Sequence, residues 1–513
     1  MAKNQSNRLL TNSLFNLLPF VNQLLIGLLL VPFVVRHLGD VTYGTWALIS
    51  SLLAYSMLLT LALNSGVNRW VPMLHARGDK SGIDRVVSTV LCTYSASAAL
   101  LCLLIAGLVY GFPHWFSIPP ELARDSQIAL VLVGGGFVCL VQSSVFSGVL
   151  SGVERYDLLA ASELSRGLIE IAGVIAVLYW DGGIVALGCV YGGAQLVRAG
   201  LSARFAFRAL PGLRPRLSLA SLQLLREMLA YSLNTFLFAI QDVLQRQIGI
   251  VLIGVFITAS AVTDYAMPTI LVSVLAAFVA QLTSVTKPAA SRMDATGEVE
   301  PLRDLFLASS KLSLMIALPI GVVFVLFGDR LLMLWLAEAY SDSMAPVLAA
   351  LAVSTVFWSW VRPAYYIVVG LGKHRLFGQL ALAKVLLSTA AAVAGLSWLG
   401  WSTFEVAVAF ALPDVIAVTF ALIPYCAHSV GLSIRRLARE SIIPALLANG
   451  PVLAALWLLQ DQLRAVEGVA FVLALAGVGV LAPIGFWLIG LTRSEKRRFL
   501  QIARIPLGPG RDN

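Results

Sequence analysis

The 513-residue chain carries charged and amide side chains inside a segment that is otherwise strongly apolar. In the stretch FAIQDVLQRQIGIVLIGV, residues 238–255, the polar side chains are Gln241, Asp242, Gln245, Arg246 and Gln247. Asp242 and Arg246 are four residues apart, the spacing at which a carboxylate and a guanidinium meet on one face of an α-helix. An ionised side chain near the bilayer centre costs roughly 2.5–3.5 kcal/mol on insertion scales, so a helix that only spans a membrane would not carry two.

Amide side chains also recur at helical spacing in two widely separated parts of the chain. Residues spaced by three, four, seven or eleven share one face of an α-helix. Two such stripes are Asn12, Asn16, Pro19 and Gln23, and Asn234, Gln241 and Gln245. Stripes of this kind either bond neighbouring helices to each other, at about 0.6 kcal/mol per contact, or line an internal cleft. The sequence leaves both interpretations open, and the amides of both stripes are candidates for substrate binding.

Acidic residues fall within other apolar segments. Glu163, Arg166 and Glu170 share one helical face, and Asp414 directly follows a proline. With Asp242, the acidic residues Glu163, Glu170 and Asp414 are candidates for coupling to H⁺ or Na⁺. Asp414 also fits a different interpretation, a hydrogen-bonded carboxyl at a proline kink.

Four further long cations lie in apolar segments and fall into two groups. Arg166, Lys311 and Lys384 are close to predicted inner loops, and we expect them to extend toward the lipid headgroups. Arg362 lies roughly ten residues from the loop at Lys373, which is about 15 Å at helical rise and therefore near mid-membrane. A guanidinium stays charged and can donate two parallel hydrogen bonds to phosphate oxygens, so Arg362 is a candidate contact for a phosphate-bearing substrate.

The composition is typical of a chain whose solvent is lipid. Hydrophobic residues make up 59% of the chain and charged residues 12%, and the mean hydropathy is +0.86. A hydrocarbon core about 30 Å thick takes about 20 apolar residues per helix, and runs of this length recur along the whole chain. We therefore predict an all-α polytopic membrane protein. The five cysteines are isolated from one another, so we predict no metal site and no cofactor.

Polar breaks divide the sequence into about fourteen transmembrane helices. They lie near residues 11–35, 42–63, 86–111, 127–150, 158–180, 183–208, 228–256, 265–286, 305–328, 344–370, 376–399, 403–426, 441–460 and 468–491.

The distribution of Lys and Arg orients these helices, because cytoplasmic loops collect both residues. With both termini in the cytoplasm, the outer connections hold only Arg36, Arg124, Arg330 and Arg464. The inner connections hold the rest of the loop charge, including Arg198, Arg204, Arg208, Arg214, Arg216 and Arg226, and Arg493, Lys496, Arg497 and Arg498. Topology thus explains the net charge of +9, which implies no nucleic-acid partner.

The chain also repeats itself at an offset of about 220 residues. The matched pairs are Asn12 and Asn234, Gln23 and Gln245, Gly27 and Gly249, Tyr43 and Tyr265, Gly78 and Gly297, Gly152 and Gly372, and Arg155 and Arg375. Because the repeated unit holds six spans, both copies share one orientation, and we expect a pseudo-twofold axis along the membrane normal. We predict an N-terminal six-helix lobe at 1–210, a C-terminal six-helix lobe at 211–430, and two extra helices with a basic cytoplasmic tail at 431–513.

The repeat bears on the charged pair in the segment 238–255. At the offset of 222, Arg246 matches Leu24 and Asp242 matches Phe20, so the charges belong to one lobe only. The pair is either a salt bridge needed for folding or a contact for the substrate, and a symmetric scaffold does not require charges in one copy alone.

Four segments carry motifs of a known family. They are VPFVVRHLGDVTYGTWALISSLLAY (31–55), SGVLSGVERYDLL (147–159), LPIGVVFVLFGDRLLMLWLAEAYSDSMAPVLAALA (318–352) and VVGLGKHRLFGQLALAKVLLS (368–388). In this order they resemble the polysaccharide-transporter branch, which includes the O-antigen flippases, of the multidrug/oligosaccharidyl-lipid/polysaccharide (MOP) flippase superfamily. The resemblance covers spans one to twelve. The sequence departs from the family pattern at Asn64, where many relatives have an acidic residue.

The resemblance implies a two-lobed helical flippase with a fold like that of the MATE exporters. Such a protein would move an undecaprenyl-pyrophosphate-linked oligosaccharide from the inner to the outer leaflet of the bacterial cytoplasmic membrane by alternating access. The implied partners are the lipid-linked glycan, the membrane lipids, and the polysaccharide polymerase and glycosyltransferase machinery. The alternative within the superfamily is a cation-coupled multidrug exporter, although such exporters tend to have twelve spans and coupling carboxylates in the leading helices of the first lobe.

Two other classes fit the sequence less well. A membrane enzyme such as a sugar polymerase would carry a large outer loop with acidic or histidine residues, whereas the predicted outer loops are short. The histidines His37, His75, His114, His374 and His428 are scattered in or near loops, so we predict no catalytic residue and no enzymatic activity. A non-transporting scaffold would have no use for costly charges within its spans.

Overall fold

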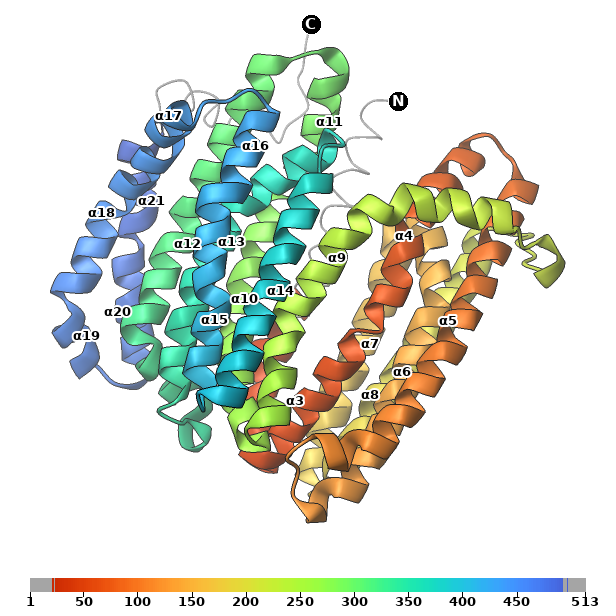
Figure 1. Ribbon diagram of the computed structural model, residues 1–513, viewed down its shortest axis with the longest axis horizontal. Coiled ribbons are helices and arrows are strands. Elements are labelled where there is room, and N and C mark those ends of the chain that lie inside the picture. Colours follow the sequence, from red (N-terminus) through yellow and green to blue (C-terminus); the bar gives the residue numbers. More distant parts are fainter. Residues whose placement is uncertain (1–20, 23, 492–495, 497–513) are drawn as a thin grey trace, which may run out of the picture. The chain divides into compact units, whose positions relative to one another are not determined.

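The computed structural model describes residues 21–22, 24–491 and 496, and all regular structure within them is helical. The α-helices, most of them labelled in Figure 1, are α2 (Val31–Leu38), α3 (Asp40–Ala54), α4 (Met57–Ala76), α5 (Lys80–Trp115), α6 (Pro120–Gly152), α7 (Tyr156–Tyr179), α8 (Ile184–Ala209), α9 (Leu222–Phe256), α10 (Ala259–Thr283), α11 (Thr286–Thr296), α12 (Val299–Leu336), α13 (Met344–Gly370), α14 (Arg375–Trp398), α15 (Thr403–Ala417), α16 (Ile423–Ser429), α17 (Ile434–Leu437), α18 (Ile443–Leu458), α19 (Gln460–Ala465), α20 (Gly468–Gly479) and α21 (Leu481–Gly485). Short π segments are η1 (Ile26–Leu30), η4 (Val418–Leu422), η5 (Ala438–Ile442) and η6 (Phe486–Gly490), and short 3₁₀ segments are η2 (Leu217–Leu219) and η3 (Ala337–Ala339).

Long helices are the expected outcome for this composition, because in lipid every backbone N–H and C=O needs a partner within the protein. Twelve helical runs in the described residues are long and apolar enough to cross a membrane. α7 is 24 residues long but carries four charged residues, so it lies outside that apolar set, and the first predicted span begins before the described residues. The prediction of an all-α polytopic membrane protein is confirmed, with fourteen as an approximate number of spans.

The helices form two compact units. The first comprises Met1–Val274, Trp335–Val347 and Gly378–Phe410. Within it, α6 packs along α8, and α9 packs against α3 and α4 (Figure 1). Small residues bring α6 and α8 close together: a Cβ added at Gly192 would lie 2.7 Å from the carbonyl oxygen of Leu132, and one at Gly136 would lie 3.1 Å from the Cα of Gly192. Close backbone approach at small residues is a usual way for membrane helices to gain packing contacts.

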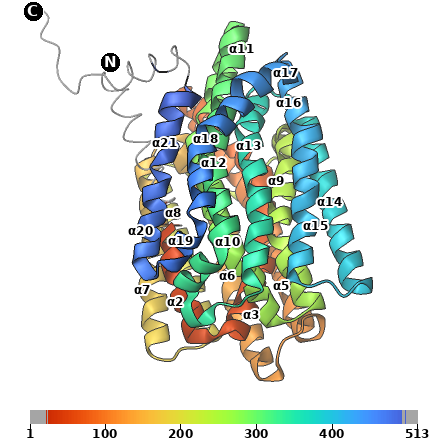
Figure 2. The same ribbon diagram turned by 90° about the vertical axis from the view of Figure 1, so that its left-hand side faces the viewer.

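The second unit comprises Leu275–Leu334, Leu348–Phe377 and Ala411–Asn513. Its C-terminal helix α18 lies beside α20 and α21, which follow one another along a single span (Figure 2). Phe327 of α12 is fully buried in a cluster with Val452, Leu456, Leu463 and Phe471. The two extra helices of the sequence prediction therefore pack on α12 through an apolar core.

One charged side chain reinforces this packing. Arg464, which belongs to α19, bonds Asp329 of α12 with an Nη1–Oδ2 distance of 2.8 Å and donates from Nη2 to the carbonyl oxygen of Leu326 at 2.6 Å. Its guanidinium also lies 5.9 Å from the ring centre of Phe327. Arg464 thus ties the connection between α18 and α20 to the end of α12.

Some residues of the predicted repeat occupy matching conformations. Gly78 and Gly297 both follow the end of a helix, with φ of +68° and +71°, a left-handed conformation that favours glycine. Gly152 and Gly372 do not match: Gly372 has φ of +70°, whereas Gly152 is the last residue of α6 and the left-handed position there is taken by Glu154. The lobe boundaries at 210 and 430 and the pseudo-twofold axis stay predictions.

Candidate functional site

The predicted charged pair forms on α9, a helix whose apolar span is Phe236–Phe256. Arg246 donates from Nε to Asp242 Oδ2 at 3.1 Å and from Nη2 to Oδ1 at 3.3 Å, which is the two-bond geometry that a guanidinium makes with a carboxylate. The side chains of Arg246 and Asp242 are 40% and 36% exposed. The pair is thus internally neutralised, yet a large part of it is not covered by protein.

The amide side chains of Gln241 and Gln245 on the same helix contact other parts of the protein. Gln241 is only 2% exposed, and its Oε1 has no hydrogen-bond partner among the described residues. Gln245 accepts a hydrogen bond from the ammonium of Lys384 on α14. Lys384 is 6% exposed, so the expectation that it extends toward the headgroups is wrong.

The reason for the burial of Lys384 is the close packing of α14 on α9. A Cβ added at Gly378 of α14 would lie 3.4 Å from the Cβ of Leu237 on α9, so the two helices run in contact. Lys384 lies six residues, about one and two-thirds turns, further along α14 and meets α9 rather than lipid. Sequence reasoning missed this bond, because nothing in the spacing of either helix reports which neighbour it will have.

A second charged cluster joins α7 to α8. Arg166 bonds Glu163 at 3.3 Å and also bonds Glu170, as the shared helical face predicts. Arg198 of α8 bonds the other oxygen of Glu163. These four side chains are 12–23% exposed, and their two negative and two positive charges balance. Arg198 was expected in an inner loop, but it lies within α8. Its position inside the predicted span 183–208 could have indicated that its guanidinium lies among the helices.

Two further predicted residues lie deep in the second unit. Asp414 of α15 is fully buried and accepts a hydrogen bond from the hydroxyl of Ser354 on α13. Lys311 of α12 is 3% exposed, so it too does not extend toward the headgroups. The bond from Ser354 gives Asp414 the partner that a carboxyl at a proline kink requires, and a buried acidic group of this kind is also what coupling to a cation uses.

Arg362 lies in the same unit, in the second half of α13. It is half-buried, and within the part of the chain that the structure describes it makes no hydrogen bond or ion pair. A guanidinium held inside a span without a protein partner is costly unless water or a ligand meets it.

The remaining predicted residues cannot be placed. Asn12, Asn16 and Gln23 lie outside the described residues, and Asn234 lies on α9 but its side chain is not described. The stripe predicted for the first span is therefore untested.

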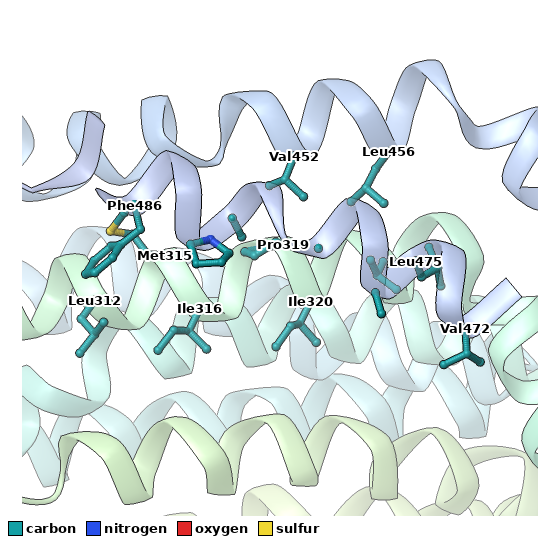
Figure 3. A pocket seen from close by; sticks show the side chains of 15 residues that line it. Leu312, Met315, Ile316, Pro319, Ile320, Val452, Leu456, Val472, Leu475 and Phe486 are labelled. Carbon is teal, nitrogen blue, oxygen red and sulfur yellow. The ribbon is translucent and has the colours of Figure 1, made fainter. Parts of the chain in front are cut away.

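The second unit also contains a large apolar cavity, of about 540 Å³, between α12 and the C-terminal helices. Figure 3 shows Leu312, Ile316 and Ile320 of α12 and Val452 and Leu456 of α18 among the side chains that line it. Its whole lining is apolar, so it offers dispersion contacts only and no group that could recognise a charged or hydroxylated ligand.

The helical arrangement is one that solved membrane transporters share. An inward-facing multidrug resistance transporter of the MATE family superimposes with a TM-score of 0.67 at 14% sequence identity, covering 84% of this chain and 96% of the other. The lipid II flippase MurJ, in an inward closed conformation, superimposes with a TM-score of 0.65 at 10% identity, covering 97% of this chain and 99% of the other. These similarities establish the fold.

The sequence comparison gives the family. A family model described as "Polysaccharide biosynthesis protein" matches residues 80–345, more than half of the chain, and the chain belongs to this family. An "Uncharacterized membrane protein EpsK" of Bacillus subtilis (strain 168) is 22% identical over 359 residues, which are 69% of this chain and 70% of that protein.

Family and fold together make the chain a multi-pass flippase or transporter of the MOP superfamily. The predicted resemblance to the polysaccharide branch of this superfamily is confirmed. The proteins of similar fold are transporters and flippases, which agrees with the prediction of a protein without enzymatic activity.

Proposed function

We propose that the protein moves an undecaprenyl-pyrophosphate-linked oligosaccharide, the repeat unit of a polysaccharide, from the inner to the outer leaflet of the bacterial cytoplasmic membrane by alternating access. Both termini would be cytoplasmic, as the distribution of Lys and Arg predicts. The polysaccharide polymerase and glycosyltransferase machinery would act on either side of this step. Membership of a polysaccharide biosynthesis family supports the substrate class.

The exposure of the Asp242–Arg246 pair is the observation that carries the proposal. A pair that is 36–40% exposed within an apolar span would be costly against hydrocarbon, so its open side must face water. We propose that this water fills a substrate cleft and that Arg246, held by Asp242, contacts the pyrophosphate. The planar fork of a guanidinium suits phosphate oxygens, whereas a cationic drug would be repelled.

Other residues have narrower proposed roles. Gln245 and Lys384 would fix α9 against α14 and add a positive charge beside the same helix. Arg362, which belongs to the second unit, is a second candidate contact for an anionic ligand. For coupling to H⁺ or Na⁺ we propose Asp414 ahead of Asp242, Glu163 and Glu170, because the charges of the latter three are already balanced by Arg246, Arg166 and Arg198.

The proposal is tested by transport of a labelled undecaprenyl-pyrophosphate-linked oligosaccharide in proteoliposomes, normalised to folded protein. Arg246→Lys keeps the charge but loses the fork, and we expect transport to fall by roughly tenfold or more, the effect of one charge-assisted hydrogen bond. The double variant Asp242→Asn with Arg246→Gln removes both charges, so it should fold normally and transport poorly.

Arg436→Lys is the matched control, because Arg436 and Glu440 form another pair at the (i, i+4) spacing. We expect it to transport normally. If the neutral double variant of Asp242 and Arg246 transports like the wild type, the pair has only a structural role. If the wild type moves cationic drugs but no lipid-linked glycan, the protein is a multidrug exporter.

A further inference from the structure

A polar cavity of about 540 Å³ lies within the first compact unit, at a corner where three connections meet. The connections are the turn from α2 to α3, the first turns of α10, and the segment from η3 to α13. We call it the corner cavity. Its side-chain functional groups come from Arg36, Asp40, Ser260, Asp264, Glu338, Tyr340 and Ser341.

The walls of the corner cavity are held by hydrogen bonds between the three connections. Arg36 donates from Nε to the carbonyl oxygen of Leu336 at 3.2 Å and from Nη2 to that of Trp335 at 3.1 Å. Thr263 donates to the carbonyl oxygen of Asp40 at 2.6 Å. These hydrogen bonds tie α2 to η3 and α3 to α10, and so fix the walls of the cavity. Its volume is in the range of about 300–1,000 Å³ that small-molecule sites have.

The lining combines acidic, hydroxyl and aromatic groups. Asp40 and Asp264 are held in place by hydroxyls, Asp40 by Ser260 and Asp264 by Ser343, the second at 2.6 Å. Glu338 brings a third carboxylate, and among the described residues Arg36 is the one cation that lines the cavity. This surplus of negative charge repels phosphate and pyrophosphate groups.

Sugar hydroxyls fit such a lining. Carboxylate oxygens accept hydrogen bonds from neighbouring hydroxyls, serine hydroxyls both donate and accept, and a tyrosine ring packs against the apolar face of a sugar. A bound metal ion fits less well, because no group of three or more His, Cys, Asp or Glu residues able to hold one is found in the residues that were placed.

The position of the cavity gives this chemistry a role. Its three connections follow the first, seventh and ninth predicted spans. In the predicted topology all three lie on the outer side of the membrane. We infer that the corner cavity is a binding subsite for an uncharged sugar residue of the glycan, used on the outer side of the membrane as the glycan arrives there. This inference rests on the proposed function.

The test measures binding of free sugars by saturation-transfer NMR to the full-length protein in nanodiscs. The probes are methyl glucoside, N-acetylglucosamine and glucuronate. We expect transfer to the two uncharged sugars and much less to glucuronate, which the carboxylates repel. Asp264→Asn and Asp40→Asn, each of which keeps the side-chain shape, should weaken binding of the uncharged sugars by about tenfold.

Asp125→Asn is the matched control, because Asp125 is an exposed carboxylate near the start of α6, on another predicted outer connection, and does not line the cavity. It should bind all three sugars as the wild type does. The inference is overturned if the wild type binds none of the sugars, if glucuronate binds as well as glucoside, or if Asp264→Asn and Asp40→Asn bind like Asp125→Asn. It is also overturned if the two variants lose binding of ²²Na⁺ or ⁴⁵Ca²⁺ but not of sugar.

Transport in proteoliposomes separates this inference from the proposed function. A wild type that moves lipid-linked glycan but fails the sugar-binding test overturns the subsite alone. A wild type that binds the uncharged sugars, but moves no lipid-linked glycan, overturns the proposed function and leaves a sugar site of another use.

Discussion

Gly44→Ala should destabilise the protein strongly, because Gly44 is the point at which α3 meets the beginning of α10. A Cβ added at Gly44 would lie 1.7 Å from the carbonyl oxygen of Ala259, 2.7 Å from its carbonyl carbon and 2.9 Å from Thr263 Oγ1. The first two atoms belong to the backbone, so no change of rotamer can relieve the overlap. The two helices must move apart instead.

The structure sets the size of the effect. A carbon and an oxygen atom in close contact lie about 3.3 Å or more apart, so α3 and α10 must separate by roughly 1.5 Å. Overpacking in a well-packed interior costs about 1–3 kcal/mol and sometimes more. The same movement would break the hydrogen bond from Thr263 to Asp40, worth about 1 kcal/mol. We therefore expect a loss of about 3 kcal/mol or more, which is over a hundredfold in the folding equilibrium.

The measurement is thermal unfolding of the purified protein in detergent, with Gly135→Ala as the matched control. Gly135 is an exposed glycine within α6, and an added Cβ there would meet nothing within 4 Å. Alanine at such a position should be neutral or slightly stabilising. Equal unfolding temperatures for the two variants would show that α3 and α10 do not pack as described. Because Asp40 and Ser260 lie beside this contact, Gly44→Ala should also reduce sugar binding at the corner cavity.

Two further predictions concern the charges inside the membrane. Glu163→Gln leaves Arg166 and Arg198 with Glu170 as the one carboxylate of their cluster. The protein should lose about 3 kcal/mol of stability, as when one partner of a buried pair is removed. Adding Arg198→Met should restore much of this stability in thermal unfolding, and the absence of any restoration would contradict the pairing of Arg198 with Glu163. Lys384→Met removes a buried ammonium but also the bond to Gln245, and these two effects on stability oppose each other, so thermal stability should change little while transport in proteoliposomes falls. Normal transport would remove Lys384 from the proposed path.

The sequence was a good guide to whatever a single helix determines. Asp242 and Arg246 could be paired from their spacing because both lie on α9, and Glu163, Arg166 and Glu170 could be placed on one face for the same reason. The spans could be predicted because lipid requires long apolar helices whatever their neighbours are.

Contacts between helices could not be predicted in this way. The bonds of Arg198 to Glu163 and of Lys384 to Gln245 depend on which helices are neighbours, and one sequence gives no measure of that. The rule that long cations extend to the headgroups gave the wrong position for Lys384, because it assumes a helix that faces lipid. The corner cavity was missed for a related reason, since its groups come from three connections far apart in the sequence.

The cluster on α7 and α8 has a consequence for how the protein is made. α7 carries Glu163, Arg166 and Glu170, and each charge near the centre of a helix costs a few kcal/mol when that helix enters the bilayer alone. α8 alone would likewise bring an unpaired Arg198 into lipid. The bond between Glu163 and Arg198 neutralises both, and only a short turn at 180–183 separates the helices. We therefore expect α7 and α8 to enter the bilayer together, as a helical hairpin.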